Sequence, residues 1–506
     1  MQNTVINRTI QNWGLAILML CICAALLTSS VQAKEGNKRY FVNSVYNIGR
    51  PNSWADMKRY KAFVDESKSR GFNSINMDVR WDSARPDGTY DFSLFDEQAN
   101  YAISKGMYIW PRLNCSLIND YNPYWFRDEM YMRDISGQIY RHQNGPIPSP
   151  THPKVLKEMA RFCKAVTEHC DHTFKALPSG ENPVVCMPFS FTATLEAEYF
   201  FDGTLDYSQS AQDQFRKWVR MEYPSLANLN AKWGTFCKTW DEVNLLKAHP
   251  TAKELYFESR LQILFDLIGN TVHKANPRMK VGMQVGCIWD IPQRRVFNVT
   301  HLLRKMDWIL VADDYTYPHA FSADYARCSA PGKQISNEFG PGVGGLHEQQ
   351  GLEQAVQTYA HGVNTVFTSN WSLEDIIDHN KWAYLREIAK LSNKSDIAPK
   401  SDDAIYLSTW DLINKRVDIW TYLKTYEKLS ENGAKIVDVI PDTIIADNPD
   451  ILLQYRSIYL PANYTITAPV RTQLLNYRSK LIVSQPDMAG TCDIYGRPQD
   501  ALMAHE

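Results

Sequence analysis

The stretch GFNSINMDV at residues 71–79 decides the fold class of this 506-residue chain. It follows a helical segment, begins with a glycine and continues as a short, largely apolar run. The same order recurs where Gly106 precedes residues 108–113 and where Gly362 precedes residues 364–368. A glycine in this position fits the end of a helix that leads into the next strand. Helices and strands that alternate in this way predict a parallel sheet.

About eight such units follow one another between Arg39 and Lys400, and eight units predict a closed (β/α)8 TIM barrel. A polar segment at residues 394–403 then precedes four more short strands, which predict a small open α/β domain. We therefore expect a barrel over residues 34–400 and a second domain over residues 403–506. The predicted barrel strands are Tyr40–Val45, Ser74–Val79, Tyr108–Leu113, Val184–Phe191, Val281–Val285, Trp308–Ala312, Gln334–Asn337 and Asn364–Thr368.

Residues 1–33 predict a signal peptide. Gly14 to Leu27 is an unbroken apolar run, and residues 31–33, VQA, have the small-x-small pattern of a cleavage site. The run is too short to span a hydrocarbon core of about 30 Å. We therefore expect a secreted or periplasmic protein with no membrane association after cleavage, and an uncleaved membrane anchor is the alternative interpretation.

The composition excludes several classes of protein. Apolar residues make up 44% of the chain, which is enough for a large core and rules out disorder. The net charge is −2, and the lysines and arginines are scattered, so we expect no nucleic-acid partner. Gly340, Gly342 and Gly345 match a dinucleotide fingerprint only formally, because no helix of a βαβ unit follows at once. We expect no cofactor.

Carboxylates stand at the ends of two predicted strands, and active sites of such barrels lie at the carboxyl ends of the strands. The fourth strand runs into Glu196 and Glu198, and the seventh runs into Glu338. Residues two apart on an extended chain face the same side, so either Glu196 or Glu198 could face the barrel mouth. Two carboxylates across one cleft can hydrolyse a glycosidic bond, one as acid and one as nucleophile. Solvated loop carboxylates are the alternative.

Other predicted strand ends carry side chains that suit a sugar. Aromatic faces stack on the C–H faces of a sugar ring, and arginine and asparagine bond its hydroxyl groups. For each of these residues alone, a place in the core is the competing interpretation. The candidates for substrate binding are Trp81, Arg112, Asn114, Trp289, Tyr315 and Trp371.

Several of these segments resemble glycoside hydrolase family 42, the β-galactosidases of a large clan of retaining (β/α)8 glycosidases. Residues 81–92, WDSARPDGTYDF, are similar to the segment after the family's second strand, and residues 337–342, NEFGPG, are similar to its nucleophile strand. Residues 215–218 with 229–234 resemble a further family motif. The resemblance implies a retaining β-glycosidase without a cofactor that acts on an oligosaccharide or glycan. Glu338 would be its nucleophile.

This chain departs from the family pattern in ways that bear on the site. The family's acid/base follows an asparagine, whereas Leu195 and Ala197 stand here, so alignment selects either Glu196 or Glu198, and we favour Glu196. Residues 206–214 lack the cysteines that bind zinc in many members, so we expect no metal. The missing asparagine also leaves the sugar open, and a β-mannosidase or another clan specificity is an alternative. A non-catalytic carbohydrate-binding barrel is the alternative from another class.

Residues 403–506 resemble the family's amidotransferase-like, flavodoxin-like trimerisation domain in a shortened form. The resemblance implies a homo-oligomer. Cys492 has no nucleophile elbow around it, so we do not expect amidotransferase chemistry in this domain.

Overall fold

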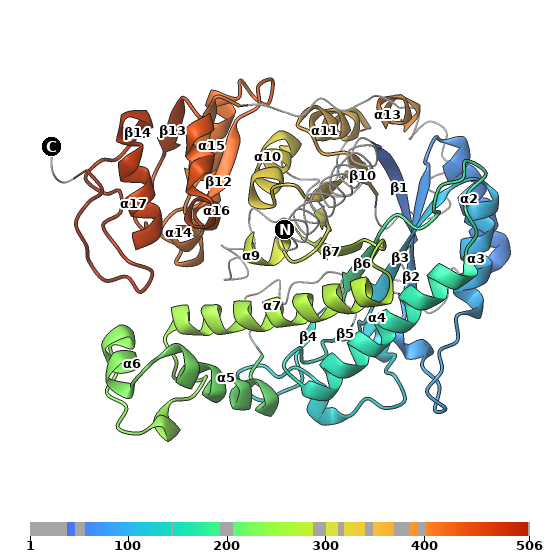
Figure 1. The fold of residues 1–506 in the computed structure, drawn as a ribbon, viewed down its shortest axis with the longest axis horizontal. Coiled ribbons are helices and arrows are strands. Elements are labelled where there is room, and N and C mark those ends of the chain that lie inside the picture. The colour runs from blue at the N-terminus through green and yellow to red at the C-terminus, as the bar shows by residue number, and fades with distance from the viewer. Residues whose placement is uncertain are drawn as a thin grey trace, which may run out of the picture.

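A computed structural model describes residues 38–45, 56–142, 145–192, 206–286, 300–311, 318–339, 348–368, 385–392 and 401–503. Eight parallel strands form a closed barrel in the order β1-β10-β9-β8-β7-β6-β3-β2 (Figure 1). The predicted (β/α)8 barrel is therefore confirmed. Its strands are β1 (Tyr40–Val45), β2 (Ser74–Arg80), β3 (Tyr108–Asn114), β6 (Met187–Ser190), β7 (Val281–Val285), β8 (Trp308–Val311), β9 (Gln334–Glu338) and β10 (Thr365–Phe367).

Helices cover the outside of the barrel. Asp56 caps the first of them by accepting a hydrogen bond from the backbone N–H of Lys58 at 2.9 Å. Gly71 has a φ of +94°, and a β-carbon there would collide with Ala389, so only glycine allows this turn into β2. The helices are α2 (Met57–Ser69), α3 (Ser93–Ser104), α4 (Pro153–Thr173), α7 (Pro250–Ala275), α9 (Thr300–Leu303), α10 (His319–Ser329), α11 (Glu348–Ala360) and α13 (Leu385–Ser392).

Two smaller insertions follow barrel strands. A short hairpin of β4 (Arg141–His142) and β5 (Gly145–Pro146) lies in the segment after β3. Helices α5 (Gln209–Glu222) and α6 (Leu226–Trp233) come after β6 and lie beside the beginning of α7, at the lower left of Figure 1. The long α7 runs alongside α4.

Side chains of the barrel strands alternate between two cores. One face of each strand packs outward on the helices in the main hydrophobic core. The other face fills the barrel interior with Val42, Trp110, Trp308, Leu310 and Phe367, together with Cys186 just before β6. The Trp110 and Trp308 rings meet edge to face with centroids 4.8 Å apart. Because Trp308 begins β8, these rings fill the interior toward the amino ends of the strands.

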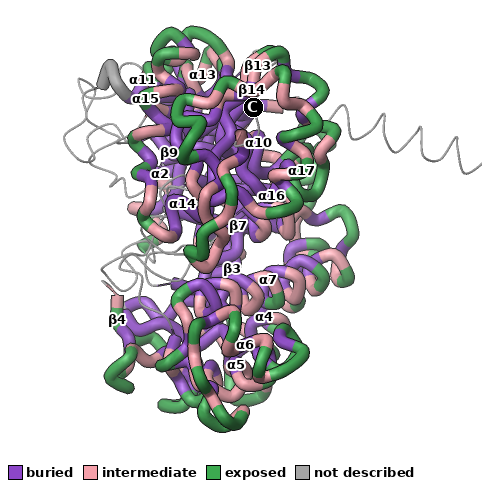
Figure 2. Tube along the Cα trace, turned by 90° about the vertical axis from the view of Figure 1, so that its left-hand side faces the viewer, coloured by how far each residue is buried: buried purple, intermediate pink, exposed green. Residues whose placement is uncertain are grey.

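Residues 403–483 form a second sheet of four parallel strands in the order β12-β11-β13-β14. It has its own hydrophobic core, and its edge strand β12 lies against α10 of the barrel (Figure 1). Figure 2 shows α10 as largely buried. The elements are β11 (Asp403–Leu407), α14 (Thr409–Ile413), α15 (Ile419–Leu429), β12 (Asp438–Pro441), α16 (Asp442–Asp447), β13 (Ser457–Leu460), α17 (Ala468–Asn476) and β14 (Leu481–Val483).

None of the helices in the described ranges combines the length and the hydropathy needed to cross a bilayer. The predicted signal peptide at residues 1–33 lies outside the described residues.

Candidate active site

Glu338 is the last residue of β9, as the sequence predicts for a carboxylate at the end of the seventh barrel strand. Ile335 belongs to the outer core, so alternation turns Ser336 and Glu338 toward the barrel interior. The Ser336 hydroxyl accepts a hydrogen bond from the Trp308 indole N–H at 2.7 Å. Glu338 is buried, with 1% of its surface exposed. The structure thus places a buried carboxylate inside the barrel at the carboxyl end of β9.

Arg112 lies on the inner face of β3 in a buried polar network. Its Nε donates to Asp78 Oδ1 at 2.7 Å, and both side chains are fully shielded from solvent. Its Nη1 donates to Gln284 Oε1 at 3.2 Å, so the guanidinium joins β3 to β2 and β7. These contacts explain how the charge is tolerated in the interior, because a buried ion needs a counter-ion and hydrogen bonds. The sequence identified Arg112 but missed Asp78 and Gln284.

Four inward polar side chains of the barrel strands have a buried atom without a hydrogen-bond partner in the described part of the chain. Ser44, Asn114 and Ser190 lie at or next to the carboxyl ends of β1, β3 and β6, whereas Asn76 is the third residue of β2. Asn114 bonds the backbone N–H of Ser116 through Oδ1, while its Nδ2 is unpaired. Leaving such a group unsatisfied costs about 1–3 kcal/mol, so this end of the barrel suits a polar ligand or water. The sequence identified only one of the four, although all occupy alternate strand positions; they are Ser44, Asn76, Asn114 and Ser190.

Trp81 does not lie with these groups. It follows β2 in a short helical turn, is 1% exposed, and belongs to the main core. Its indole N–H donates to the carbonyl of Ser116 at 2.8 Å, and its ring meets Trp125 edge to face at 5.4 Å. Trp81 thus supports the segment after β3, and no open face for sugar stacking is left on it.

The remaining predicted site residues lie outside the described residues: Glu196, Glu198, Trp289, Tyr315 and Trp371. The segment that carries Glu196 and Glu198 is followed by an anchored residue, Asp206. Its carboxyl accepts from the Ser149 hydroxyl at 2.6 Å and from the Ser208 backbone N–H at 2.8 Å. Burial raises the pKa of Asp206, and these hydrogen bonds oppose the shift. Asp206 ties the start of α5 to the segment after β3.

Within the described ranges, no group of three or more histidine, cysteine, aspartate or glutamate side chains is arranged to hold a metal ion.

Residues 49–261 match the family model of glycoside hydrolase family 42, whose description is beta-galactosidase. Beta-galactosidase BgaB of Geobacillus sp. (strain Y412MC61) is 24% identical over 211 residues, which are 40% of this chain and 29% of that protein. The beta-amylase of Bacillus cereus is 24% identical over 244 residues, 44% of each chain. These matches confirm that the chain resembles family 42 as a divergent relative. The region aligned with BgaB spans less than a third of BgaB.

The solved beta-galactosidase of Rahnella sp. R3 superposes with a TM-score of 0.71 at 16% identity, over 91% of this chain and 73% of that one. At this identity the likeness establishes the fold.

Proposed function

We propose that the chain is a β-glycosidase of the β-galactosidase type that hydrolyses terminal β-linked sugars with retention of configuration. The observation that carries the proposal is Glu338, a buried carboxylate on the inner face of β9 at the end where barrel active sites lie. The family 42 match over residues 49–261 supports it.

In the proposed reaction the Glu338 carboxylate attacks the anomeric carbon and forms a glycosyl ester, while the bond to the leaving oxygen breaks. Glu196 or Glu198 gives that oxygen a proton. The same residue, now a carboxylate, takes a proton from water, which attacks the anomeric carbon and releases Glu338. The inward Asn114 and Ser190, at the carboxyl ends of β3 and β6, would bond sugar hydroxyls. Arg112 is paired with Asp78 below the sugar. It would hold the neighbouring strands in place and would not itself contact the sugar.

The test is hydrolysis of nitrophenyl β-galactoside, β-mannoside, β-glucoside, β-fucoside and β-arabinoside by the wild type and by Glu338→Gln. We expect turnover of one glycone that falls by several orders of magnitude in the variant, with an unchanged circular dichroism spectrum. Turnover of the mannoside alone would select the β-mannosidase alternative. Binding of a sugar by a folded protein that hydrolyses none of the panel would select the non-catalytic barrel.

A second candidate is hydrolysis of an α-glucan, which the likeness to the Bacillus cereus beta-amylase favours. The two candidates differ in substrate and in stereochemistry, because an inverting pair of carboxylates is about 6.5–9.5 Å apart and a retaining pair about 5–5.5 Å apart. Proton NMR of the first-formed sugar from soluble starch and from the nitrophenyl panel separates them.

We also propose that residues 403–506 correspond to the amidotransferase-like domain of family 42 and support a homo-oligomer. The parallel strand order β12-β11-β13-β14 supports this assignment, because it is that of a doubly wound sheet. Light scattering after size exclusion measures the oligomeric state. Export after cleavage at Ala33 is part of the same proposal, and amino-terminal sequencing of the protein from the extracellular or periplasmic fraction tests it.

A further inference from the structure

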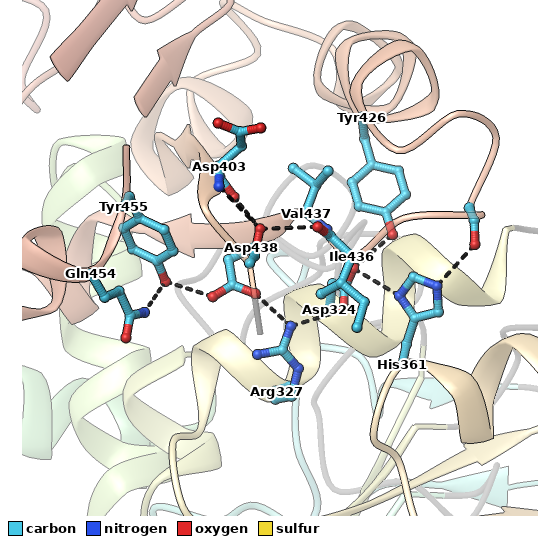
Figure 3. A network of polar contacts seen from close by, with 12 residues as sticks. Asp324, Arg327, His361, Asp403, Tyr426, Ile436, Val437, Asp438, Gln454 and Tyr455 are labelled. Carbon is cyan, nitrogen blue, oxygen red and sulfur yellow. Dashed lines mark hydrogen bonds and ion pairs between the residues drawn. The ribbon is translucent and has the colours of Figure 1, made fainter. Parts of the chain in front are cut away.

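A cluster of buried charges joins the barrel to the C-terminal sheet (Figure 3). Asp324 and Arg327 lie on α10, and Asp438 is the first residue of β12. The Arg327 guanidinium reaches both carboxylates, with Nη2 2.9 Å from Asp324 Oδ1 and 2.5 Å from Asp438 Oδ1. Asp438 also accepts from the Tyr455 hydroxyl at 2.6 Å. One arginine thus bridges the two parts of the chain.

His361, directly after α11, completes the cluster. Its Nδ1 lies 2.9 Å from Asp324 Oδ2, and its Nε2 lies 3.1 Å from the carbonyl oxygen of Gly433, in the loop before β12. A carbonyl oxygen can only accept a hydrogen bond, so Nε2 must carry a proton. The state of the other nitrogen depends on whether Asp324 is ionised.

Four donors surround the Asp324 carboxyl. They are Arg327, His361, the Tyr426 hydroxyl at 2.7 Å and the Val437 backbone N–H at 3.3 Å. Three of these donors meet at Oδ2 and Arg327 meets Oδ1, so the Asp324 carboxyl is surrounded by donors and acts as the acceptor. Both nitrogens of His361 therefore donate, and the ring is an imidazolium. Burial lowers the pKa of His361, but the hydrogen bond and charge of Asp324 and the Gly433 carbonyl outweigh it, and the pKa is raised overall.

The charges in the cluster balance only while His361 is protonated. Arg327 and His361 then offset Asp324 and Asp438, and loss of the proton leaves a net negative charge beside an acceptor lone pair. Burial and the nearby carboxylate hold the pKa of Tyr426 above its ordinary value, so this hydroxyl stays neutral. The loop that carries Gly433 adds an exposed ion pair of opposite charges, Glu431 with Lys435.

We propose that protonated His361 is a pH-sensitive latch that docks the C-terminal sheet on the barrel and releases it as the ring loses its proton. A histidine whose pKa is raised on folding contributes fully below its unfolded value near 6.5, and the contribution disappears as the pH rises through the folded value. Docking is therefore tight in acid and loosens in alkali.

A second interface group acts in the same direction. Thr443 and Thr300 share a hydrogen bond at 2.5 Å between the C-terminal sheet and α9. The neighbouring Asp442 is buried, and burial raises its pKa to about 6. Above that pH it adds a further buried negative charge near the interface, beside Glu258 and His301, which form a pair at 2.5 Å.

The experiment is hydrogen–deuterium exchange of the full chain at pH 6 and pH 9, corrected for the intrinsic exchange rate. We expect protection of α10 and β12 to fall by about tenfold or more at pH 9, since one pKa unit corresponds to a tenfold change in equilibrium. Protection of β2 and β3 should stay unchanged. Equal protection of α10 and β12 at both pH values would overturn the proposal, whatever the variants do.

His361→Gln should lower protection of α10 and β12 at pH 6 and remove most of the pH dependence. The matched control is His273→Gln, which breaks another histidine–aspartate pair, 2.7 Å from Asp307 and within the barrel. The control should keep the wild-type profile at α10 and β12. If the His361→Gln protein retains the wild-type pH dependence at α10 and β12, the proposal that His361 controls docking is also overturned.

Discussion

Arg112 Nε lies 2.7 Å from Asp78 Oδ1, and neither side chain exposes any surface to solvent. Removing one member of such a pair leaves an uncompensated buried charge, which costs about 3–5 kcal/mol. We therefore expect Arg112→Met to lower the free energy of unfolding in urea by about that amount. The control is Arg141→Met, which breaks an exposed pair with Asp120 at 2.7 Å and should cost about 1 kcal/mol or less. If both variants lose the same amount of unfolding free energy, the buried Arg112–Asp78 pair does not have the role described here.

The acid/base can be assigned by comparing Glu196→Ala with Glu198→Ala. The acid/base variant should lose about 10²–10⁴-fold of turnover on a substrate with a poor leaving group. It should keep the first step on a dinitrophenyl glycoside, because that leaving group needs no proton, and azide should restore turnover by replacing the activated water. The other variant serves as its control and should stay near the wild type. Full activity in both variants would remove both residues from the mechanism.

Asp411 gives the stability of the protein a defined pH dependence. Burial raises its pKa to about 7, from an ordinary 3.8, against the opposing bonds from Thr465. The folded state thus binds this proton more tightly than the unfolded state, so its contribution to stability declines from about pH 4 to about pH 7 and is flat above. Asp411→Asn keeps the acceptor for the Thr465 N–H and has no charge to bury. Relative to the wild type it should gain stability across that window in urea unfolding at five pH values, and parallel profiles would contradict the assignment.

Gly282 leaves room inside the barrel for two neighbours. A β-carbon at this residue would lie 2.9 Å from Cys186 Sγ and 3.0 Å from Leu310 Cδ1. Overpacking of this kind costs about 1–3 kcal/mol, so Gly282→Ala should lower the unfolding free energy by that amount. Cys186→Ala in the same chain should restore part of the loss, which a double-mutant cycle measures. Strict additivity of the two changes would show that the contact is not responsible.

The barrel could be predicted from the sequence because each strand is marked locally, by a helix, a glycine and an apolar run. Glu338 was placed correctly at its strand end for the same reason, since a strand end is a local feature. The fourth strand was predicted too long, as Val184–Phe191, whereas β6 is Met187–Ser190 and Val184 makes only an isolated bridge to Ile109. The apolar residues extend further along the chain than the backbone hydrogen bonds of β6. The pattern of apolar residues does not show where strand pairing begins.

The contacts that the side chains of the site make with one another could not be predicted from the sequence. Its place near a strand end predicts Arg112 as a sugar contact, but its counter-ion Asp78 lies 34 positions away, and only the register of β2 against β3 brings the two together. Trp81 was interpreted in the same way, and the contact with Trp125 that buries it is likewise tertiary.

The pairing of β1 with β10 sets the order of events during synthesis. Tyr40 pairs with Thr365, so the first strand made by the ribosome finds its second neighbour only after nearly the whole barrel has been translated. At about 5–20 residues per second, the interval is on the order of 15–65 s. Through that time the open edge of β1 is exposed to other chains, which is the kind of edge that chaperones protect. The nascent protein must therefore be kept from aggregating for tens of seconds before its barrel can close.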